Sequence, residues 1–265
     1  MKLSQVFMIA VTVSFIFCDI VFTQIRAGRD TVKQVQEQMN YKKSLKEFSE
    51  NMKKNMSPEA WDKGEKAGQD AITELNAKGA ASRALGAGAL VPSFSLKDAF
   101  GKSVSSSELF GKGAVVLVFY RGSWCPYCSL YLKTLQKWLV RIESQGAVVV
   151  GITAETPSRP MTFEKKELTF TVLSDPKLKV SEKFGVVYDV PAGLDEYYKG
   201  IGKNVAKEND MEQPAMIMSS IYIVNKAGRI IHAYVDVNPK TWPEPSEIVA
   251  NLRQLNLNKK SSQSQ

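Results

Sequence analysis

Two cysteines three residues apart carry the clearest chemistry in this sequence. Cys125 and Cys128 enclose Pro126 and Tyr127, and the only other cysteine is Cys18. If Cys125 is the N-cap of a helix, Pro126 is its first residue, where a proline costs the helix no hydrogen bond. Cys128 then lies on the same helix face, close enough for a disulfide. The pair can therefore cycle between a dithiol and a disulfide.

The surrounding residues favour a thiolate at Cys125. The backbone amides of Tyr127 and Cys128 and the positive end of the helix dipole stabilise a negative charge at the N-terminus of a helix. Arg121 adds a positive charge four residues before Cys125. Because the thiolate is the reactive form of cysteine, this local chemistry predicts that Cys125 attacks first and that Cys128 resolves the product.

Two other uses of the cysteine pair are less well supported. A zinc site needs two further ligands, and after residue 23 the chain offers only His232 and no further thiol. A purely structural disulfide between residues three apart removes little chain entropy and would stabilise the fold weakly. We therefore favour a redox pair and keep the structural disulfide as an alternative, with no metal or cofactor expected.

The predicted elements place the pair at a strand-to-helix corner. The run Ala114–Phe119 is unbroken and apolar, as in a strand that is covered on both faces of a parallel sheet. After Cys128 the apolar residues recur largely at helical spacing, which predicts one helix with a broad apolar face. These residues are Leu130, Leu132, Leu135, Trp138, Leu139 and Ile142.

Strands and helices alternate after the cysteines, which predicts a largely parallel sheet in this part of the chain. An earlier pair of strands, within residues 94–105, reads as a hairpin. The later elements are predicted as strands at 147–153, 170–173, 216–224 and 229–237, helices at 161–168, 180–184 and 246–255, and a long loop with one helical turn at 188–213.

The N-terminal part of the chain has a different organisation. An apolar run at 6–18 follows Lys2 and has the length of a signal-peptide core, which predicts a signal peptide at 1–23 and a secreted, luminal or periplasmic protein. An uncleaved membrane anchor is the alternative. Residues 24–88 are predicted to form a helical extension, in which Ser57 caps a helix that begins at Pro58.

The remaining boundaries follow from composition. Residues 89–257 are predicted to form the main domain, and the polar residues 258–265 a disordered tail. Of the 265 residues, 44% are hydrophobic and 23% charged, which excludes a chain that is disordered throughout. The net charge of +8 is spread over lysine pairs without interleaved aromatic residues, so we expect a solvated surface and no nucleic-acid partner.

The order of several motifs resembles a known family. These are the Phe119-Tyr120 pair before the cysteines and the segments at 91–96, 173–176, 224–228 and 244–248. From about Leu45 to Leu255 the chain resembles the peroxiredoxin-like branch, with a CxxC motif, of the alkyl hydroperoxide reductase/thiol-specific antioxidant proteins. The resemblance implies a thioredoxin-like α/β fold, with a central mixed sheet flanked by helices and a helical N-terminal extension.

The resemblance also implies a function. It points to a thiol peroxidase that reduces hydrogen peroxide or organic hydroperoxides and is recycled by a thioredoxin- or glutathione-type reductant. Two alternatives stay open: a thioredoxin- or glutaredoxin-like oxidoreductase that acts on protein disulfides, and a non-catalytic protein with a structural disulfide.

The roles that the resemblance assigns differ from those that local chemistry predicts. The peroxidatic cysteine of the family falls on Cys128, Cys125 takes the place of its threonine or serine, and Arg121 replaces its proline. Ser219 stands where peroxiredoxins carry an arginine and thioredoxins a cis-proline. The candidates for binding or activating the substrate are Arg121, Trp124, Pro126, Tyr127 and Ser219.

Overall fold

The computed structural model describes residues 40–155 and 168–263. The predicted signal peptide at 1–23, the extension before residue 40 and most of the predicted helix at 161–168 lie outside the described residues and stay predictions. Among the described residues, no helix is both long and apolar enough to cross a membrane.

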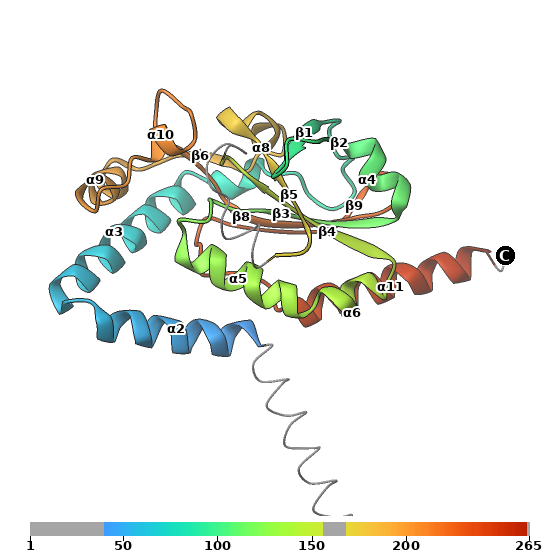
Figure 1. Ribbon diagram of the computed structural model, residues 1–265, viewed down its shortest axis with the longest axis horizontal. Helices are drawn as coiled ribbons and strands as arrows, with labels where there is room; N and C mark the ends of the chain where they lie inside the picture. Colours follow the sequence, from blue (N-terminus) through green and yellow to red (C-terminus); the bar gives the residue numbers. More distant parts are fainter. Residues whose placement is uncertain (1–39, 156–167, 264–265) are drawn as a thin grey trace, which may run out of the picture.

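A seven-stranded mixed sheet forms the centre of the protein, in the order β2-β1-β5-β4-β3-β8-β9 (Figure 1). The parallel pairs β3–β4 and β4–β5 lie at its centre, and the outer pairs are antiparallel. This arrangement confirms the predicted α/β fold class. The strands are β1 (Ser95–Asp98), β2 (Ser103–Ser105), β3 (Ala114–Phe119), β4 (Ala147–Thr153), β5 (Thr171–Ser174), β8 (Ser219–Val224) and β9 (Ile230–Asp236).

Strand β3 is buried along its whole length, as its unbroken apolar sequence predicts. Successive side chains of a strand point to opposite faces of the sheet. Val115, Leu117 and Phe119 accordingly belong to one hydrophobic core, whereas Val116 and Val118 belong to the other. Both faces of the sheet are therefore covered, and the loop that carries the cysteines leaves from the middle of a two-sided core.

Different helices cover the two faces of the sheet. The core that contains Val116 also contains residues of α2, α5, α6 and α11, which lie together below the sheet in Figure 1. The core that contains Phe119 includes residues of α3, α4, α8, α9 and α10. The helices are α2 (Tyr41–Asn55), α3 (Pro58–Ala77), α4 (Ser106–Lys112), α5 (Pro126–Lys137), α6 (Leu139–Glu143), α8 (Lys179–Lys183), α9 (Ala192–Gly200), α10 (Val205–Glu208) and α11 (Pro245–Gln263).

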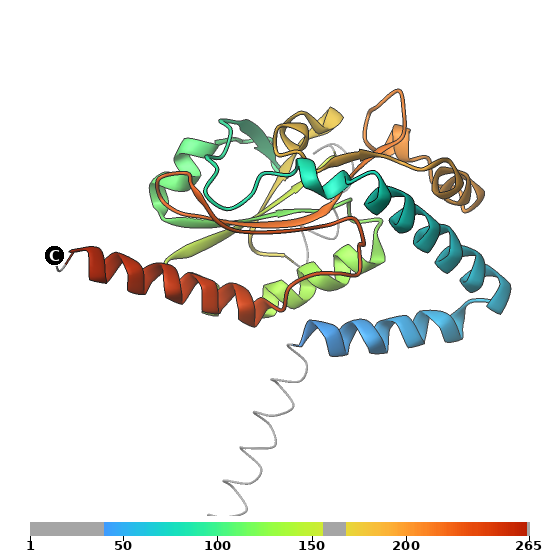
Figure 2. The same ribbon diagram turned by 180° about the vertical axis from the view of Figure 1, so that it is seen from behind.

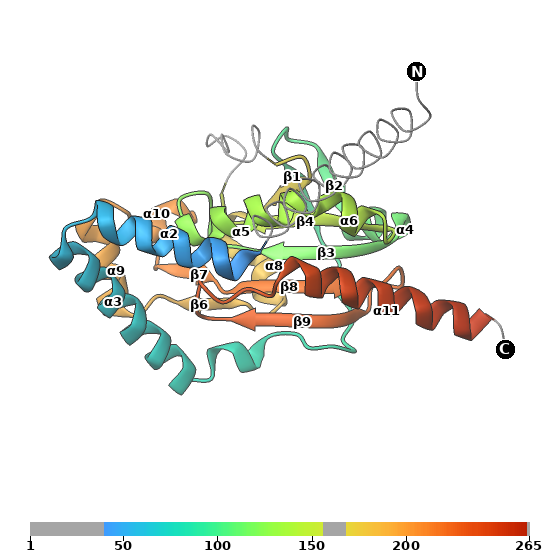
Figure 3. The ribbon, with the colours of Figure 1, turned by 90° about the horizontal axis from the view of Figure 1, so that it is seen from below.

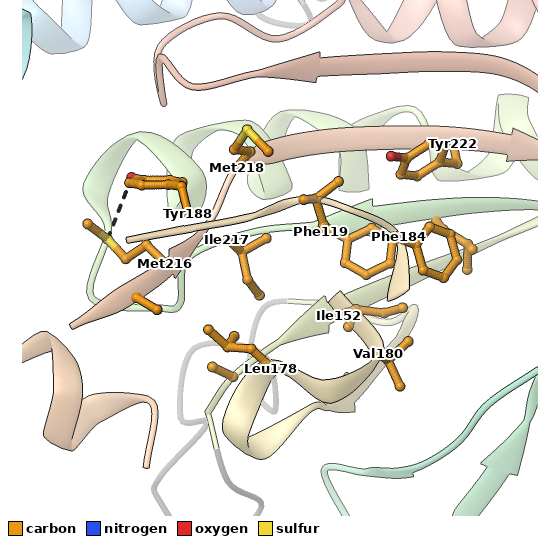
Figure 4. Close-up of a cluster of buried hydrophobic side chains, with 14 of the residues drawn as sticks. Phe119, Ile152, Leu178, Val180, Phe184, Tyr188, Met216, Ile217, Met218 and Tyr222 are labelled. Atoms are coloured by element: carbon orange, nitrogen blue, oxygen red, sulfur yellow. Dashed lines mark hydrogen bonds between the residues drawn. The ribbon is translucent and has the colours of Figure 1, made fainter. Parts of the chain in front are cut away.

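Aromatic packing supports the end of β3 from which the cysteine loop departs. The Phe119 ring lies 4.7 Å from the Phe184 ring and 5.8 Å from the Tyr222 ring, measured between centroids. Figure 4 shows the Phe119 and Phe184 rings beside Ile152, with Tyr222 above them. Aromatic pairs at such distances stabilise a core beyond the area they bury. The last residue of β3 is therefore firmly held.

The N-terminal extension is helical in its described part and lies against the main domain. Ser57 accepts a hydrogen bond from the amide of Ala60 over 3.2 Å, and Pro58 opens α3, which confirms the predicted helix start. Figures 2 and 3 show α2 running beside α5, with α3 leading from its end back toward the sheet. The extension thus contacts the helix that begins at the cysteines.

The prediction of a long loop at 188–213 is wrong. This segment starts in β6 (Val187–Asp189) and contains α9 and α10. Buried Leu194 and Val205 anchor the two helices in the core, although Gly193 and Gly200 weaken the helical pattern in the sequence. The predicted strand at 216–224 is in fact two strands, because β7 (Ala215–Ile217) pairs with β6 in a separate small sheet.

Two helix boundaries also differ from those predicted. The helix after the cysteines is interrupted at Trp138, between α5 and α6. The last helix continues to Gln263, beyond the predicted end at Leu255. The disordered tail at 258–265 stays a prediction. No proline or glycine follows Leu255, and Asn256 does not interrupt α11.

Candidate active site

Cys125 is the N-cap of α5 and Pro126 its first residue, as the sequence predicts. The Cys125 sulfur accepts a hydrogen bond from the amide of Cys128 over 3.4 Å. The Cys128 thiol donates to the same sulfur, with the two Sγ atoms 2.8 Å apart. Both cysteines are free thiols in this structure. The strand-to-helix corner thus brings the pair together in a reduced form that is ready to close a disulfide.

Both cysteines are enclosed by protein. Cys125 is 3% exposed and Cys128 is fully buried, whereas Pro126 between them is exposed. A sulfur this deep reacts only with small molecules unless the structure around it moves.

The surroundings ionise the two thiols very differently. Burial alone would raise the pKa of Cys125, but the hydrogen bond from the Cys128 thiol, the charge of Arg121 and the amides of Cys128 and Tyr127 together lower this pKa to about 7. Burial raises the pKa of Cys128 well above its usual range, and the hydrogen bond to Cys125 adds to the rise. Cys125 is therefore the thiolate of the pair, and Cys128 keeps its proton.

Arg121 places a buried positive charge near both sulfurs. Its side chain donates from Nη2 to the Val237 carbonyl over 3.1 Å and from Nη1 to the Tyr198 hydroxyl over 3.4 Å. The guanidinium carbon lies 5.9 Å from the centre of the Tyr188 ring. None of the described Asp or Glu side chains forms an ion pair with Arg121, and its Nε has no hydrogen-bond partner.

A buried carboxylate fixes the loop between Arg121 and the cysteines. Glu155 accepts from the Ser123 amide over 2.9 Å and from the Ser123 hydroxyl over 2.7 Å. Gly122 adopts a φ of +142°, and a Cβ there would lie 2.6 Å from Nε1 of Trp124. Only glycine fits this position without strain. The loop conformation that presents Cys125 is therefore specified at two adjacent residues.

Trp124 is covered from the α9 side of the molecule. Its ring packs edge-to-face against Tyr198, with the centroids 5.6 Å apart, and Lys203 Nζ lies 5.7 Å from its centre. The indole Nε1 is buried and has no hydrogen-bond partner among the residues that the structure describes. The segment predicted as a loop thus supplies two side chains, those of Tyr198 and Lys203, around the dithiol.

Tyr127 is covered from the opposite side. The Phe48 ring of α2 lies edge-to-face against it at 5.9 Å, and Lys240 Nζ lies 5.0 Å from its centre. Lys240 in turn contacts Glu65 of α3, with Nζ 2.6 Å from one carboxylate oxygen and 2.8 Å from the other. The N-terminal extension therefore forms part of the wall around the cysteines.

Ser219 lies at the start of β8, one residue from the pair Phe119–Ser220 that joins β8 to β3. It is buried, and within the described part of the chain its hydroxyl has no hydrogen-bond partner. Ser219 also pairs with Asp236, the residue before Val237, whose carbonyl binds the Arg121 guanidinium. The arginine at 121 and the serine at 219 thus approach the same end of the sheet.

A comparison with known families identifies the chain. The AhpC/TSA family matches residues 87–233, more than half of the 265 residues. The chain belongs to the AhpC/TSA family.

Curated peroxiredoxins are similar to part of this chain. Peroxiredoxin Q of Populus jackii is 39% identical over 100 residues, which cover 37% of this chain and 46% of that protein. Peroxiredoxin Bcp of Escherichia coli K12 is 35% identical over 118 residues, or 44% of this chain and 74% of that one. The chain thus spans about half the length of the plant relative.

The crystal structure of Peroxidoxin BcpB from Mycobacterium tuberculosis has the same fold. It superposes with a TM-score of 0.51 at 20% identity and covers 64% of this chain and 97% of that one. At this level of identity the likeness concerns the fold alone.

Several residues around the site were not singled out by the sequence. Phe48, Glu65 and Lys240 lie outside the part matched by the AhpC/TSA family. Glu155 carries one signal that was available, because it follows the carboxyl end of β4, and such strand ends collect functional groups in α/β sheets. The roles of Tyr198 and Lys240 depend on tertiary contacts that no local sequence pattern predicts.

The arrangement suits thiol redox chemistry. A thiolate with a neutral thiol in hydrogen-bond contact supplies a nucleophile, a proton donor and a resolving group in one place. Among the residues that the structure describes, no three His, Cys, Asp or Glu side chains gather as metal ligands.

Proposed function

We propose that this AhpC/TSA protein is a thiol peroxidase that reduces hydrogen peroxide or organic hydroperoxides, with Cys125 as the attacking sulfur. The observation that carries the proposal is the hydrogen bond from the Cys128 thiol to the Cys125 sulfur, over 2.8 Å, at a helix N-terminus. It stabilises a thiolate on Cys125 and keeps the resolving sulfur in contact with it. The names of the curated relatives, which are peroxiredoxins, support the same chemistry.

The reaction proceeds in two steps. The Cys125 thiolate attacks one oxygen of the hydroperoxide, an S–O bond forms, and the O–O bond breaks with its electron pair leaving on the alkoxide or hydroxide. This leaving group takes the proton of the Cys128 thiol and departs as alcohol or water. The Cys128 thiolate then attacks the Cys125 sulfenic acid, which closes the disulfide and expels hydroxide that solvent protonates to water.

Arg121 contributes to the first step in this scheme. Negative charge moves from the Cys125 sulfur to the departing oxygen, and a fixed positive charge in a water-poor site stabilises such a transition state. Arg121 is 5% exposed and has no carboxylate partner among the described residues, so its charge is available to the reacting groups.

Disulfide exchange is the alternative function for the same pair. A Cys125 thiolate at a helix N-terminus would also attack disulfides. The enclosure of Cys125 argues against a folded protein as the first substrate, because its disulfide would have to reach a sulfur in a residue that is 3% exposed. In the proposed peroxidase cycle, a thioredoxin- or glutathione-type thiol reduces the Cys125–Cys128 disulfide once the structure around the site has opened.

Single serine variants test the proposal. Cys128→Ser keeps a hydroxyl donor beside Cys125 but removes the resolving sulfur, so we expect one rapid turnover with peroxide and a sulfenic acid on Cys125. Cys125→Ser leaves the high-pKa thiol and should react slowly. Stopped-flow peroxide consumption and mass spectrometry of a dimedone adduct report both results.

The outcomes separate the hypotheses. A rapid turnover and adduct in Cys125→Ser instead would reverse the roles and favour the order that the family resemblance implies. Wild-type protein that consumes peroxide no faster than free cysteine would reject the peroxidase. In that case, mixed disulfides trapped through Cys125 in Cys128→Ser would indicate an exchanger, and their absence a structural disulfide.

A further inference from the structure

Lys240 contacts three separate elements next to the dithiol. Its ammonium group lies over the ring of Tyr127, a residue between the two cysteines in the sequence. The same group contacts both carboxylate oxygens of Glu65 on α3. Its backbone carbonyl accepts a hydrogen bond from the Tyr41 hydroxyl on α2, over 3.0 Å. One residue therefore ties both N-terminal helices to the segment that carries the cysteines.

A second contact fixes the start of α2 nearby. The amides of Tyr41 and Lys42 donate to the two carboxylate oxygens of Glu244, over 2.9 and 2.8 Å. A carboxylate at a helix N-terminus satisfies amides that have no partner within the helix. The Tyr41 ring packs edge-to-face on Tyr131 of α5, with centroids 5.0 Å apart. These contacts hold α2 against α5, and Phe48 of α2 packs on the Tyr127 ring.

The ion pair between Lys240 and Glu65 is partly exposed to solvent. The Lys240 and Glu65 side chains are 30% and 43% exposed, so water competes for both charges. Ion pairs that are this exposed contribute little to the stability of a whole domain. Lys240 and Glu65 can therefore set the balance between a closed and an open extension without determining whether the domain folds.

We propose that the Lys240–Glu65 pair holds the N-terminal helices over the dithiol as a cap, and that this cap restricts the attack by Cys125 to small hydroperoxides. The cap consists of α2 and α3. The inference rests on the proposed function for the identity of the substrate. Its structural part, control of access to Cys125, can be measured without peroxide.

The test compares small and bulky reagents at the same sulfur. Iodoacetamide and hydrogen peroxide serve as small probes, and a polyethylene-glycol maleimide and cumene hydroperoxide as bulky ones. The variants are Lys240→Met, which keeps the stem and removes the charge, and the exchanged pair Lys240→Glu with Glu65→Lys. Peptide mapping by mass spectrometry assigns the maleimide adduct to Cys125.

A matched ion pair on the same helix provides the control. The ammonium of Lys66 and the carboxylate of Asp70, both on α3, lie 2.7 Å apart at an exposed site. Lys66→Met also removes one lysine charge from an ion pair on α3, and it should leave all four rates unchanged.

We expect Lys240→Met to raise the rates with the bulky reagents by roughly twofold to fivefold, in line with the strength of an exposed ion pair. Phe48→Ala added to it should raise them further, while the rates with the small reagents stay within about twofold. The exchanged pair should restore the wild-type ratio of bulky to small rates. Circular dichroism confirms that each variant is folded.

The opposite results reject the cap. The extension does not select substrates by size if the rates with bulky and with small reagents rise together. The same conclusion follows if the rates with bulky reagents do not change even with Phe48→Ala. A failure of the exchanged pair to restore the ratio removes the role of the ion pair. If the maleimide rates behave as expected but no variant consumes peroxide, the cap stands and the peroxidase alone is rejected.

Discussion

Arg121 Nη2 donates a hydrogen bond to the Val237 carbonyl over 3.1 Å, and this bond holds a guanidinium beside the dithiol at a point where none of the described carboxylates pairs with it. A buried charge without a counter-ion is strongly unfavourable. The thiolate of Cys125, whose pKa the Arg121 charge lowers, supplies the missing negative charge. The reduced protein therefore balances the Arg121 charge, and the disulfide form does not.

Replacement of Arg121 should make Cys125 harder to ionise. The Arg121 charge lowers the pKa of Cys125, so Arg121→Met should move the ionisation midpoint upward from about 7. The ultraviolet absorbance of the thiolate, followed against pH, measures this shift. Arg141→Met removes an exposed guanidinium that stacks on Trp138 and should leave the midpoint in place. An unchanged midpoint in Arg121→Met would show that the two groups are not coupled.

The reactivity of the wild type should follow the ionisation of Cys125. With a pKa of about 7, the thiolate fraction rises from about one tenth at about pH 6 to about nine tenths at about pH 8. The iodoacetamide rate should rise over the same range and then level off, because the pKa of Cys128 lies well above it. A rate that keeps rising through the ordinary cysteine range would contradict a lowered pKa at Cys125.

An added methyl group at Gly122 should disturb the cysteine loop. The positive φ is unfavourable for alanine, and its Cβ would lie 2.6 Å from Trp124 Nε1 and 3.3 Å from the Glu155 carboxyl carbon. We expect Gly122→Ala to lower the free energy of unfolding by about 1–3 kcal/mol in urea denaturation. Gly68→Ala, within α3 and with open space around it, should instead raise it by about 0.5–1 kcal/mol.

Asp175 should matter for stability and not for thiol chemistry. Its buried carboxylate accepts from the Val180 amide over 2.9 Å and from the amide and hydroxyl of Ser181 over 2.7 Å each. Asp175→Ala leaves these donors without a partner and should cost roughly 2–4 kcal/mol of unfolding free energy, with a smaller loss for Asp175→Asn. The ionisation midpoint of Cys125 should stay at its wild-type value. A shift of that midpoint in Asp175→Asn would connect Asp175 to the site.

Local patterns predicted the part of the site that is local in sequence. The apolar run of β3 and the Cys-Pro-Tyr-Cys corner determine the strand, the N-cap and the spacing of the two sulfurs without help from the rest of the chain. The approach of Arg121 to the pair was also foreseen, since four residues separate it from Cys125. The sequence alone left the difference in pKa between the two thiols open, because the raised pKa of Cys128 depends on its burial.

Tertiary contacts determine the remainder. The sequence predicts a loop around Tyr198, because two glycines weaken the helical pattern there, yet Tyr198 lies in α9 and contacts both Trp124 and Arg121. Lys240 lies in an irregular segment, and only folding brings it to Glu65, 175 residues earlier. Neither residue has a neighbour in sequence that indicates its position in space.

The long separation between α2 and its anchors has a consequence for synthesis of the protein. Tyr41 and the Glu244 that binds its amide are 203 residues apart, so the ribosome makes the helix long before the carboxylate that holds it. During that interval α5, which begins at the cysteines, can form before Glu244, which holds α2 in place, has been synthesised. A nascent chain should therefore expose Cys125 to reagents and to other thiols during translation, and should withdraw it only after the segment around residue 244 has emerged.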